Sequence, residues 1–596
     1  MGFPDAKWAV DQIVSKIGVQ PNNMRKFTAV SKSETQIALQ FTEPEDSRYS
    51  EGGAIAATTK GVVIRMSTED YPQTPNDGTL VVNNTNLGAY SDTDFIVSGL
   101  TKDVPVYFSA FPYSTIGVYN ESLAGANKAI ATPKSAEIVN VVINVTDVTE
   151  FTGATVTLRN INTQETVVKQ MGGPGTVQFD AEQGNTFVVE VSEVTAYSVD
   201  KLQSEQFTAV AGGTRTIEFT YTYGFLYTIT FDNGADGIPS SFEYSDDAAG
   251  FTPASVSDMG SWANSPILDK FRPCVIKPGA TSPEYYLNKN NYNQRETGTT
   301  APILTGADGD VMVEIAKMWY KVTKNSSAKT ITLSISEIPR EGFSCFNEVA
   351  GQELDFVYKG CYDASESDGQ MRSVSGVTPA VSKTRAQFRT LARARGNEYS
   401  QNDYYLVFLY ECMYIMLYGT RDSQTAIGRG RSASGNNSAI NTGTMNDKPF
   451  CWGDTGGTNG MKFLGVENFY GNIWHFVDGL TIVELSAKVT RDPSKYDDVG
   501  TSYETTIGNV PSGASGSYIK EMHGNKDGIF LPSVVGGSET TYYCDALWTN
   551  TGTRVAMFGG RWNSAGRVGA FYWSLYAVAS SSDANIGSRL CRKKVG

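Results

Sequence analysis

The sequence predicts a multidomain, mostly β protein that ends in a larger α+β part. The chain has 596 residues, which is enough for several hydrophobic cores. Its 59 glycines and its 31 Tyr and 28 Phe are typical of β structure with many turns. Short stretches in which apolar and polar residues alternate, as in half-buried strands, recur through the first 224 residues.

Residues 21–134 are predicted to form the first β-sandwich. Apolar residues alternate along 37–41, as in a strand with one buried face. Leu100 and Tyr107, in DFIVSGLTKDVPVYFSAFPYS (94–114), are spaced as in fibronectin type III domains, where the tyrosine hydroxyl bonds back to the chain. The segment resembles that family, which implies a fibronectin-III-like sandwich that acts as a spacer.

A second small, Ig-like β-sandwich is predicted at residues 135–224. Turn residues such as Gly172, Gly173 and Pro174 separate its strands. The predicted strands are VVINV (141–145), ATVTL (154–158), FVVEV (187–191) and TIEFTYTY (216–223).

The rest of the chain is predicted as a β-rich connector or collar at 225–309 and an α+β domain at 310–596. Two helices are predicted in the α+β domain. One begins at Thr384, which has Gln387 in capping-box spacing. The other, NDYYLVFLYECMYIMLYG (402–419), is apolar on nearly all sides and is therefore expected to be enclosed.

Charge and apolar runs limit the partners and the location. The net charge of −14 argues against nucleic-acid binding, which needs a basic face. Residues 1–20 are predicted as an attachment segment: MGFPDAKWAVDQIVSKIG lacks the apolar core of a signal peptide and is expected to form a short amphipathic helix. The longest apolar run, 404–417, is too short to span a bilayer. We therefore expect synthesis in a cytoplasm and no membrane insertion.

The sequence predicts no metal site and no cofactor. The seven cysteines are scattered and form no CxxC pair, so buried, reduced thiols are expected. The acidic segments DNGADG (232–237) and DGDV (308–311) lack the full pattern of a calcium loop and are predicted as turns.

Three motifs of the C-terminal part carry a resemblance. They are VMVEIAKMWYKV (311–322), GNIWHFVDG (471–479) and the pattern GG-x-W…G-x-F…NIG-x-R between 559 and 589. Gly559 and Gly560 would let the backbone pass close to Trp474. Taken together, the motifs resemble the C-type-lectin fold in its formylglycine-generating-enzyme branch, over residues 310–596.

Within that superfamily, NTGTRVAMFGGRWNSAGRVGAFYWSL (550–575) is most similar to the terminal variable region of diversity-generating-retroelement variable proteins. The best-known members are receptor-binding proteins of phage tails. The resemblance implies a fixed frame with varied, solvent-facing side chains at about 545–590. The variable, ligand-binding role falls on Asn550, Arg561, Asn563, Ser564, Arg567, Tyr572, Ser574, Tyr576 and Ala577, of which Tyr572 could also belong to the frame. The scaffold role falls on Trp474, Gly559, Gly560, Trp562, Phe571, Trp573, Gly587 and Arg589.

The variable side chains also suit binding on physical grounds. Tyr, Ser, Asn and Arg combine aromatic area with adaptable hydrogen bonding. A central Tyr576 flanked by Arg561 and Arg567 is the expected hot spot. Arg589 is expected to be buried and to bond carbonyls or a carboxylate.

The resemblance implies a tail-tip receptor-binding, host-adhesion protein of the virion, in a tail fibre or tail tip, without catalytic residues. Its expected partners are a host bacterial surface protein or glycan, other tail or baseplate proteins, and two further copies in a homotrimer. A diversified adhesin displayed by a bacterium is one alternative, and an oxidase-like or glycan-degrading enzyme is another. Against an enzyme, His475 is expected to be structural or at the surface, and His523 has no evident partner. Cys544 and Cys591 do not match the cysteine pair of the oxidases.

Overall fold

Strands dominate the structure, a computed structural model, with 40% of the residues in strands and 8% in helices. It describes residues 19–594 except 50–52, 149, 195 and 257. Contacts divide the chain into two units, Met1–Tyr223 and Gly224–Gly596. The predicted fold class, multidomain and mostly β, is confirmed. The helix predicted at MGFPDAKWAVDQIVSKIG (1–18) lies outside the described residues.

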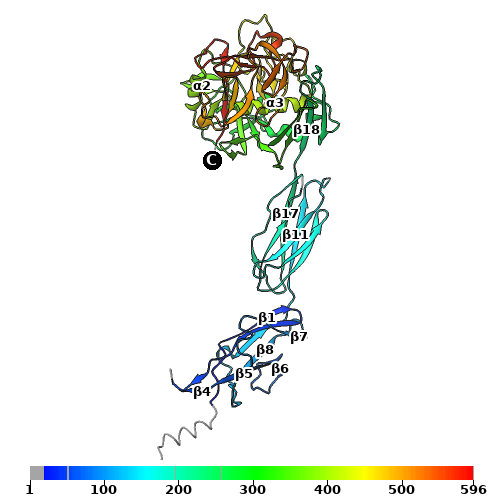
Figure 1. Cartoon of the computed structure of the whole chain (residues 1–596), viewed down its shortest axis with the longest axis vertical. Coiled ribbons are helices and arrows are strands. Elements are labelled where there is room, and N and C mark those ends of the chain that lie inside the picture. Colours follow the sequence, from blue (N-terminus) through cyan, green and yellow to red (C-terminus); the bar gives the residue numbers. More distant parts are fainter. Residues whose placement is uncertain (1–18, 50–52, 149, 195, 257, 595–596) are drawn as a thin grey trace, which may run out of the picture. The chain divides into compact units, whose positions relative to one another are not determined.

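Two sheets form the first β-sandwich, in the orders β1-β2-β7 and β6-β5-β8-β9 (Figure 1). Ile37, Leu39 and Phe41 are buried in its core, as their alternation predicts. The predicted tyrosine corner is not formed, because Tyr107 packs its ring against Tyr71 (centroids 5.0 Å apart) and its hydroxyl has no hydrogen bond to another described residue. The strands are β1 (Lys26–Ser33), β2 (Gln36–Thr42), β3 (Ser47–Arg48), β4 (Ile55–Ala57), β5 (Thr59–Ser67), β6 (Thr79–Asn84), β7 (Phe95–Ser98), β8 (Val106–Ser114) and β9 (Lys128–Ala131), with a 3-10 turn at Gly125–Asn127.

The second β-sandwich also has two sheets, in the orders β13-β10-β17-β15 and β12-β11-β14-β16. The four predicted strands lie in β10, β11, β14 and β17, and β10 pairs with β17 in parallel. Tyrosines here do bond back to the chain: the hydroxyls of Tyr197 and Tyr221 donate to the carbonyls of Asp147 and Ser192, each at 2.5 Å. The strands are β10 (Glu137–Val145), β11 (Ala154–Asn160), β12 (Thr166–Met171), β13 (Gly175–Ala181), β14 (Thr186–Val191), β15 (Tyr197–Val199), β16 (Phe207–Thr208) and β17 (Thr214–Tyr223).

The second unit contains sheets of five, seven and nine strands. The five-stranded sheet has the order β19-β18-β25-β24-β26 and the seven-stranded sheet the order β22-β21-β20-β23-β29-β44-β32. Their strands are β18 (Leu226–Asp232), β19 (Phe242–Asp246), β20 (Phe271–Ile276), β21 (Tyr285–Asn288), β22 (Asn291–Arg295), β23 (Asp310–Ala316), β24 (Trp319–Asn325), β25 (Thr330–Ser336), β26 (Ser344–Cys345), β29 (Phe356–Gly360), β32 (Tyr399–Gln401) and β44 (Leu590–Arg592).

The nine-stranded sheet runs β37-β36-β35-β41-β42-β40-β38-β39, and β43 pairs with β35. Its strands are β35 (Trp474–Val483), β36 (Ser486–Val489), β37 (Thr505–Asn509), β38 (Ser515–Met522), β39 (Pro532–Val535), β40 (Ala546–Thr549), β41 (Thr553–Phe558), β42 (Trp573–Leu575) and β43 (Ile586–Gly587). Short hairpins are β27 (Glu348–Val349) with β28 (Gln352–Glu353), β30 (Ser365–Ser367) with β31 (Gln370–Arg372), and β33 (Lys462–Phe463) with β34 (Val466–Glu467). The 3-10 turns are Gly260–Asn264, Pro266–Lys270, Pro493–Lys495 and Ala565–Arg567.

Residues 225–309, expected as a connector, share sheets with the residues that follow them. β18 pairs with β25 over seven residues, and β20 pairs with β23 over six. The reason is that each of these strands needs a ladder partner, which the chain after 310 supplies. We call the second unit, Gly224–Gly596, the head. Residues 225–309 are therefore part of the head.

The two predicted helices are present. α2 (Arg385–Arg393) begins with the predicted capping box of Thr384 and Gln387. α3 (Tyr404–Tyr418) is enclosed, since each of its side chains is buried. It begins one residue later than predicted, at an N-cap formed by Asp403, and ends at Gly419, whose φ is 57°. A third helix, α4 (Ser423–Ala426), is a single turn. No helix of the described residues is long and apolar enough to cross a membrane.

Candidate functional site

The predicted variable region, about 545–590, lies mainly in the nine-stranded sheet. β42 runs between β40, which is parallel to it, and β41, which is antiparallel. Trp573 of β42 is fully buried and packs against Phe558 of β41, with ring centroids 5.0 Å apart. Partners on both sides and a buried aromatic anchor hold this strand in one position.

Gly559 and Gly560 form a close backbone passage, as predicted, but not against Trp474 itself. Both have positive φ, 91° and 77°. A Cβ at Gly560 would lie 2.6 Å from Cγ2 of Val568 and 2.9 Å from Cδ1 of Tyr572. Tyr572 in turn lies against Trp474, with ring centroids 4.7 Å apart. The glycine therefore gives room to Tyr572.

Arg589 is fully buried and ties loops together. Its guanidinium donates to the carbonyls of Gly360 (3.1 Å), Glu467 (2.7 Å) and Asn468 (3.0 Å) and to Oδ1 of Asp363 (2.9 Å). These are the carbonyl and carboxylate partners that the sequence predicts for a buried arginine.

His475 belongs to the same buried cluster. Its Nε2 lies 2.7 Å from Oδ1 of Asp363, and Asn472 donates to Oδ2 of that aspartate at 2.7 Å. Burial lowers the pKa of His475. Burial opposes ionisation of Asp363, but the hydrogen bond from His475 and the charge of Arg589 outweigh it and lower its pKa. The cluster is enclosed, so His475 has a structural position and not a surface one.

The nine predicted ligand-binding residues differ in exposure. Asn563, Arg567 and Tyr576 are exposed. Asn550, Arg561 and Ser564 are half-buried. Tyr572, Ser574 and Ala577 are buried. The expectation that all of them face solvent is therefore wrong for the last three.

Cross-strand neighbours explain why the buried ones are covered. Ser574 pairs with Trp548 on one side and with Met557 on the other, and both side chains are much larger. Tyr572 is packed on Trp474, and its hydroxyl accepts a hydrogen bond from Nε1 of Trp548 at 3.1 Å. Tyr572 thus belongs to the frame.

Trp562, predicted as scaffold, is only half-buried. Its loop is held through the backbone instead: its N–H donates to the carbonyl of Asn472 (2.9 Å), and its carbonyl accepts from Nδ2 of Asn436 (2.8 Å). The Ser564 hydroxyl accepts from the N–H of Arg561 at 3.1 Å, so it closes its own turn. The other scaffold predictions, Phe571, Trp573, Gly587 and Arg589, are buried.

Arg561 and Arg567 lie around Tyr572. Burial raises the pKa of Tyr572, and the charges of these two arginines oppose that rise. A Cβ at Gly516 would lie 3.1 Å from Cζ2 of Trp548 and 3.4 Å from Nε of Arg567, so the Trp548 ring and the Arg567 guanidinium flank this glycine. Trp548 is not among the predicted binding residues, although it lies in the predicted variable region, two residues before Asn550.

Tyr576 lies at the other end of β42, so the hot spot of Tyr576 between Arg561 and Arg567 is not formed. Tyr576 is 52% exposed. Its neighbour is instead Arg554, whose guanidinium lies 5.7 Å from the centroid of the Tyr576 ring. The same guanidinium donates to the Tyr576 carbonyl at 3.2 Å. The β40–β42 pairing ends at Thr549 and Leu575, the residues that directly precede Asn550 and Tyr576. Arg567 and Tyr576 thus lie near opposite ends of β42.

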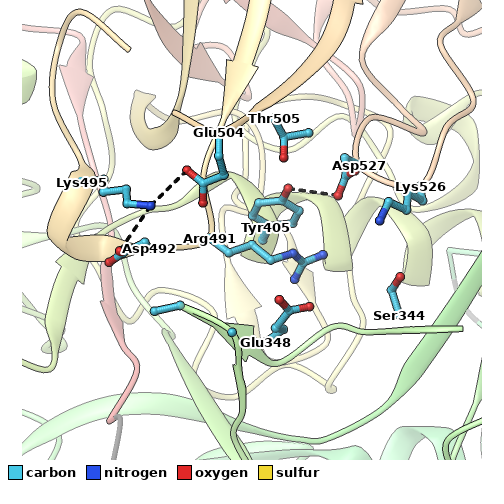
Figure 2. Close-up of a pocket in the computed structure, with 12 residues that line it drawn as sticks. Ser344, Glu348, Tyr405, Arg491, Asp492, Lys495, Glu504, Thr505, Lys526 and Asp527 are labelled. Carbon is cyan, nitrogen blue, oxygen red and sulfur yellow. Dashed lines mark hydrogen bonds and ion pairs between the residues drawn. The ribbon is translucent and has the colours of Figure 1, made fainter. Parts of the chain in front are cut away.

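A separate polar cavity of about 270 Å³ lies elsewhere in the head (Figure 2). It is lined by Ser344, Glu348, Ala350, Gly351, Tyr405, Arg491, Asp492, Lys495, Glu504, Thr505, Lys526 and Asp527, and thus by no predicted ligand-binding residue. Arg491 is stacked on the Tyr405 ring at 3.7 Å, and its guanidinium donates to the Tyr320 hydroxyl at 2.8 Å.

Several charged groups of this cavity have polar partners. Glu504 accepts from Thr490 (3.0 Å) and pairs with Lys495 (3.5 Å), while Asp527 accepts from the Tyr405 hydroxyl (3.2 Å), as Figure 2 shows for Lys495 and Tyr405. Its one serine is not accompanied by a histidine in the described lining, so a nucleophile with a base is not assembled there.

The seven cysteines are free, and six of them are buried. Cys544 and Cys591 are both buried. Burial raises the pKa of Cys591 to about 11 and that of Cys544 further, so both are thiols at neutral pH. The described residues contain no cluster of His, Cys, Asp or Glu that could hold a metal ion.

No family model and no curated protein matches this sequence. Among solved structures, a bacterial adhesin from Mobiluncus mulieris with intramolecular disulfide, isopeptide and ester cross-links is 9% identical, covering 33% of this chain and 99% of its own, at a TM-score of 0.13. A two-domain fibronectin type III segment of chicken tenascin is 12% identical; the match covers 32% of this chain and 99% of the tenascin segment, at a TM-score of 0.13. The FN1–FN3 domains of chicken CNTN1 are 9% identical; the match covers 57% of this chain and 92% of the CNTN1 chain, at a TM-score of 0.13.

Proposed function

We propose that this protein is a binding protein whose head attaches to a ligand on a bacterial surface without catalysis. The observation that carries the proposal is the contrast along residues 559–577. Asn563, Arg567 and Tyr576 are exposed. Gly559, Gly560 and Trp573 are buried and belong to the fixed frame.

We call the following set the variable surface: the exposed residues Asn563, Arg567 and Tyr576 and the half-buried residues Asn550, Arg561 and Trp548. Ligand binding costs less when the side chains stand on a frame that does not reorganise. Aromatic and arginine side chains are also those most often found at binding hot spots.

The resemblance to retroelement-diversified proteins extends the proposal. It supports a tail-fibre or tail-tip protein of a phage virion, held by other tail or baseplate proteins and assembled as a homotrimer. A host surface protein or glycan would then be the ligand, and several weak sites on one particle would gain avidity. An adhesin displayed by a bacterium would use the same surface.

The experiment uses the purified, fluorescently labelled full chain and a panel of bacterial isolates. Flow cytometry measures binding, before and after the cells are treated with protease or with periodate. We expect saturable binding to a subset of isolates, and loss of binding after one of the two treatments identifies the ligand as protein or glycan.

A glycan-degrading enzyme would behave differently. Glycoside hydrolysis uses a pair of carboxylates, and Glu348 and Glu504 line one cavity. Sugars released from the cells are therefore measured in the same samples. Release that is abolished by Glu348→Gln, in the absence of stable binding, would contradict the proposal.

A further inference from the structure

Lys359 of β29 is a buried lysine without a counter-ion. Its Nζ donates to Oδ1 of Asn402 at 2.5 Å, and both residues are 1% exposed. Nζ forms no ion pair with a described residue, and the ring centroid of Tyr410 lies 5.5 Å from it. An isolated buried charge is costly, so this contact is unusual for an ammonium group.

The sheet itself brings the two side chains together. Lys359 faces Cys591 of β44, which faces Ser400 of β32. Side chains at paired positions share one face of a sheet, so Lys359 and Ser400 lie on the same face. Two strand spacings, roughly 10 Å, separate their backbones. Asn402 follows Ser400 by two residues and precedes the N-cap of α3.

The surroundings raise the share of neutral amine above that of an ordinary lysine, although the ammonium form still predominates at pH 7. Burial lowers the pKa of Lys359 to about 8. The thiol of Cys591 supplies no negative charge, since burial raises its pKa to about 11. Asp403 already pairs with Lys593, with Oδ2 and Nζ 2.6 Å apart. The charges of Arg589 and Lys593 also disfavour the ammonium form. A desolvated lysine amine is a nucleophile.

We propose that Lys359 and Asn402 form an intramolecular isopeptide bond. Nζ attacks Cγ of Asn402, the Cγ–Nδ2 bond breaks, and the proton that Nζ loses leaves with Nδ2 as ammonia. The reaction neither oxidises nor reduces the protein and needs no co-reactant. The cross-link joins the centre of the seven-stranded sheet to the start of α3.

The mass of the protein tests this directly. The intact full chain is measured by high-resolution mass spectrometry under denaturing conditions, and its peptides are sequenced after digestion. We expect the wild-type chain to be lighter than its sequence by one ammonia, and a branched peptide to join Lys359 to Asn402.

Three variants sharpen the result. Lys359→Arg and Asn402→Ala should each restore the full mass. Lys462→Arg is the matched control, because Lys462 is also buried with a pKa lowered to about 8, but its amine donates to the carbonyl of Lys448. This variant should keep the ammonia loss.

Each contrary outcome overturns the proposal. One is wild-type protein at its full mass, a result that does not depend on whether any variant folds. Another is an ammonia loss confined to a single linear peptide, as from a succinimide. The third is a loss of water that maps to Lys593 and Asp403.

Discussion

The indole N–H of Trp573 donates a hydrogen bond to Oε1 of Glu411 at 3.0 Å, inside the core of the head. The two side chains come from β42, which lies in the predicted variable region, and from the enclosed helix α3. Burial raises the pKa of Glu411 well above its usual range, so folding favours the neutral carboxyl. The bond therefore anchors β42 to α3.

Glu411→Gln should stabilise the protein, and more so at high pH. The unfolded chain loses the Glu411 proton above its ordinary pKa, whereas the folded chain retains it. In the wild type, this group's contribution to stability is thus fully present at low pH and falls as pH rises from the unfolded toward the folded pKa. Glutamine keeps the acceptor for Trp573 without this loss. Thermal melts at pH 5 and pH 8 measure the difference between the two proteins.

The control for this effect is Glu411→Leu. It leaves the Trp573 N–H buried without its acceptor, which costs about 1–3 kcal/mol. A Glu411→Gln protein whose gain in melting temperature is the same at both pH values would show that Glu411 is not held neutral.

Trp573→Ala should cost about 3–5 kcal/mol of unfolding free energy, because it empties a site in the core. Trp562→Ala should cost much less, since Trp562 is half-buried and its loop is held by backbone hydrogen bonds. Urea denaturation of both variants gives the comparison. Equal losses would mean that Trp562 is a core residue after all.

Gly560→Ala should destabilise the head more than Gly513→Ala. Both glycines have left-handed φ, 77° and 65°, so each alanine carries a backbone strain of about 1–2 kcal/mol. Only at Gly560 does the new Cβ also meet packed side chains, 2.6 Å from Val568; nothing lies within 4 Å at Gly513. Melting temperatures that fall equally would exclude a packing role for Gly560.

The sequence predicts the frame better than the surface. The alternation at Ile37, Leu39 and Phe41 and the capping box at Thr384 are local patterns, and the structure confirms both. Tyr572 and Ser574 are buried by neighbours in β35, β40 and β41, and those pairings join segments far apart in the chain. Local sequence does not contain that information.

The position of Tyr576 illustrates the same limit. Sequence proximity suggests that Arg561 and Arg567 are its neighbours, but the turn at Ala565–Arg567 and the direction of β42 place both arginines near Tyr572 instead. The C-terminal strand β44, which lies between β29 and β32, could not be placed from periodicity either, because it has only three residues.

Natural variation should follow exposure. Deep sequencing of this gene in a propagated population should show substitutions at Asn550, Arg561, Asn563, Arg567 and Tyr576. Trp573, Gly560 and the buried Tyr572 should stay constant, because changes there cost stability. Substitutions at Tyr572 as frequent as those at Arg567 would contradict the division into surface and frame.

The most direct measurement of the central claim is binding of two charge-reversed full-chain proteins to a bacterial isolate that binds the wild type. Arg567→Glu changes the variable surface; Arg393→Glu changes an exposed arginine of α2 and is the matched control. We predict a loss of at least about tenfold in affinity for Arg567→Glu, unchanged binding for Arg393→Glu, and an unchanged melting temperature for both. Full binding by the Arg567→Glu protein, or equal losses in the two, would contradict a binding site at this surface.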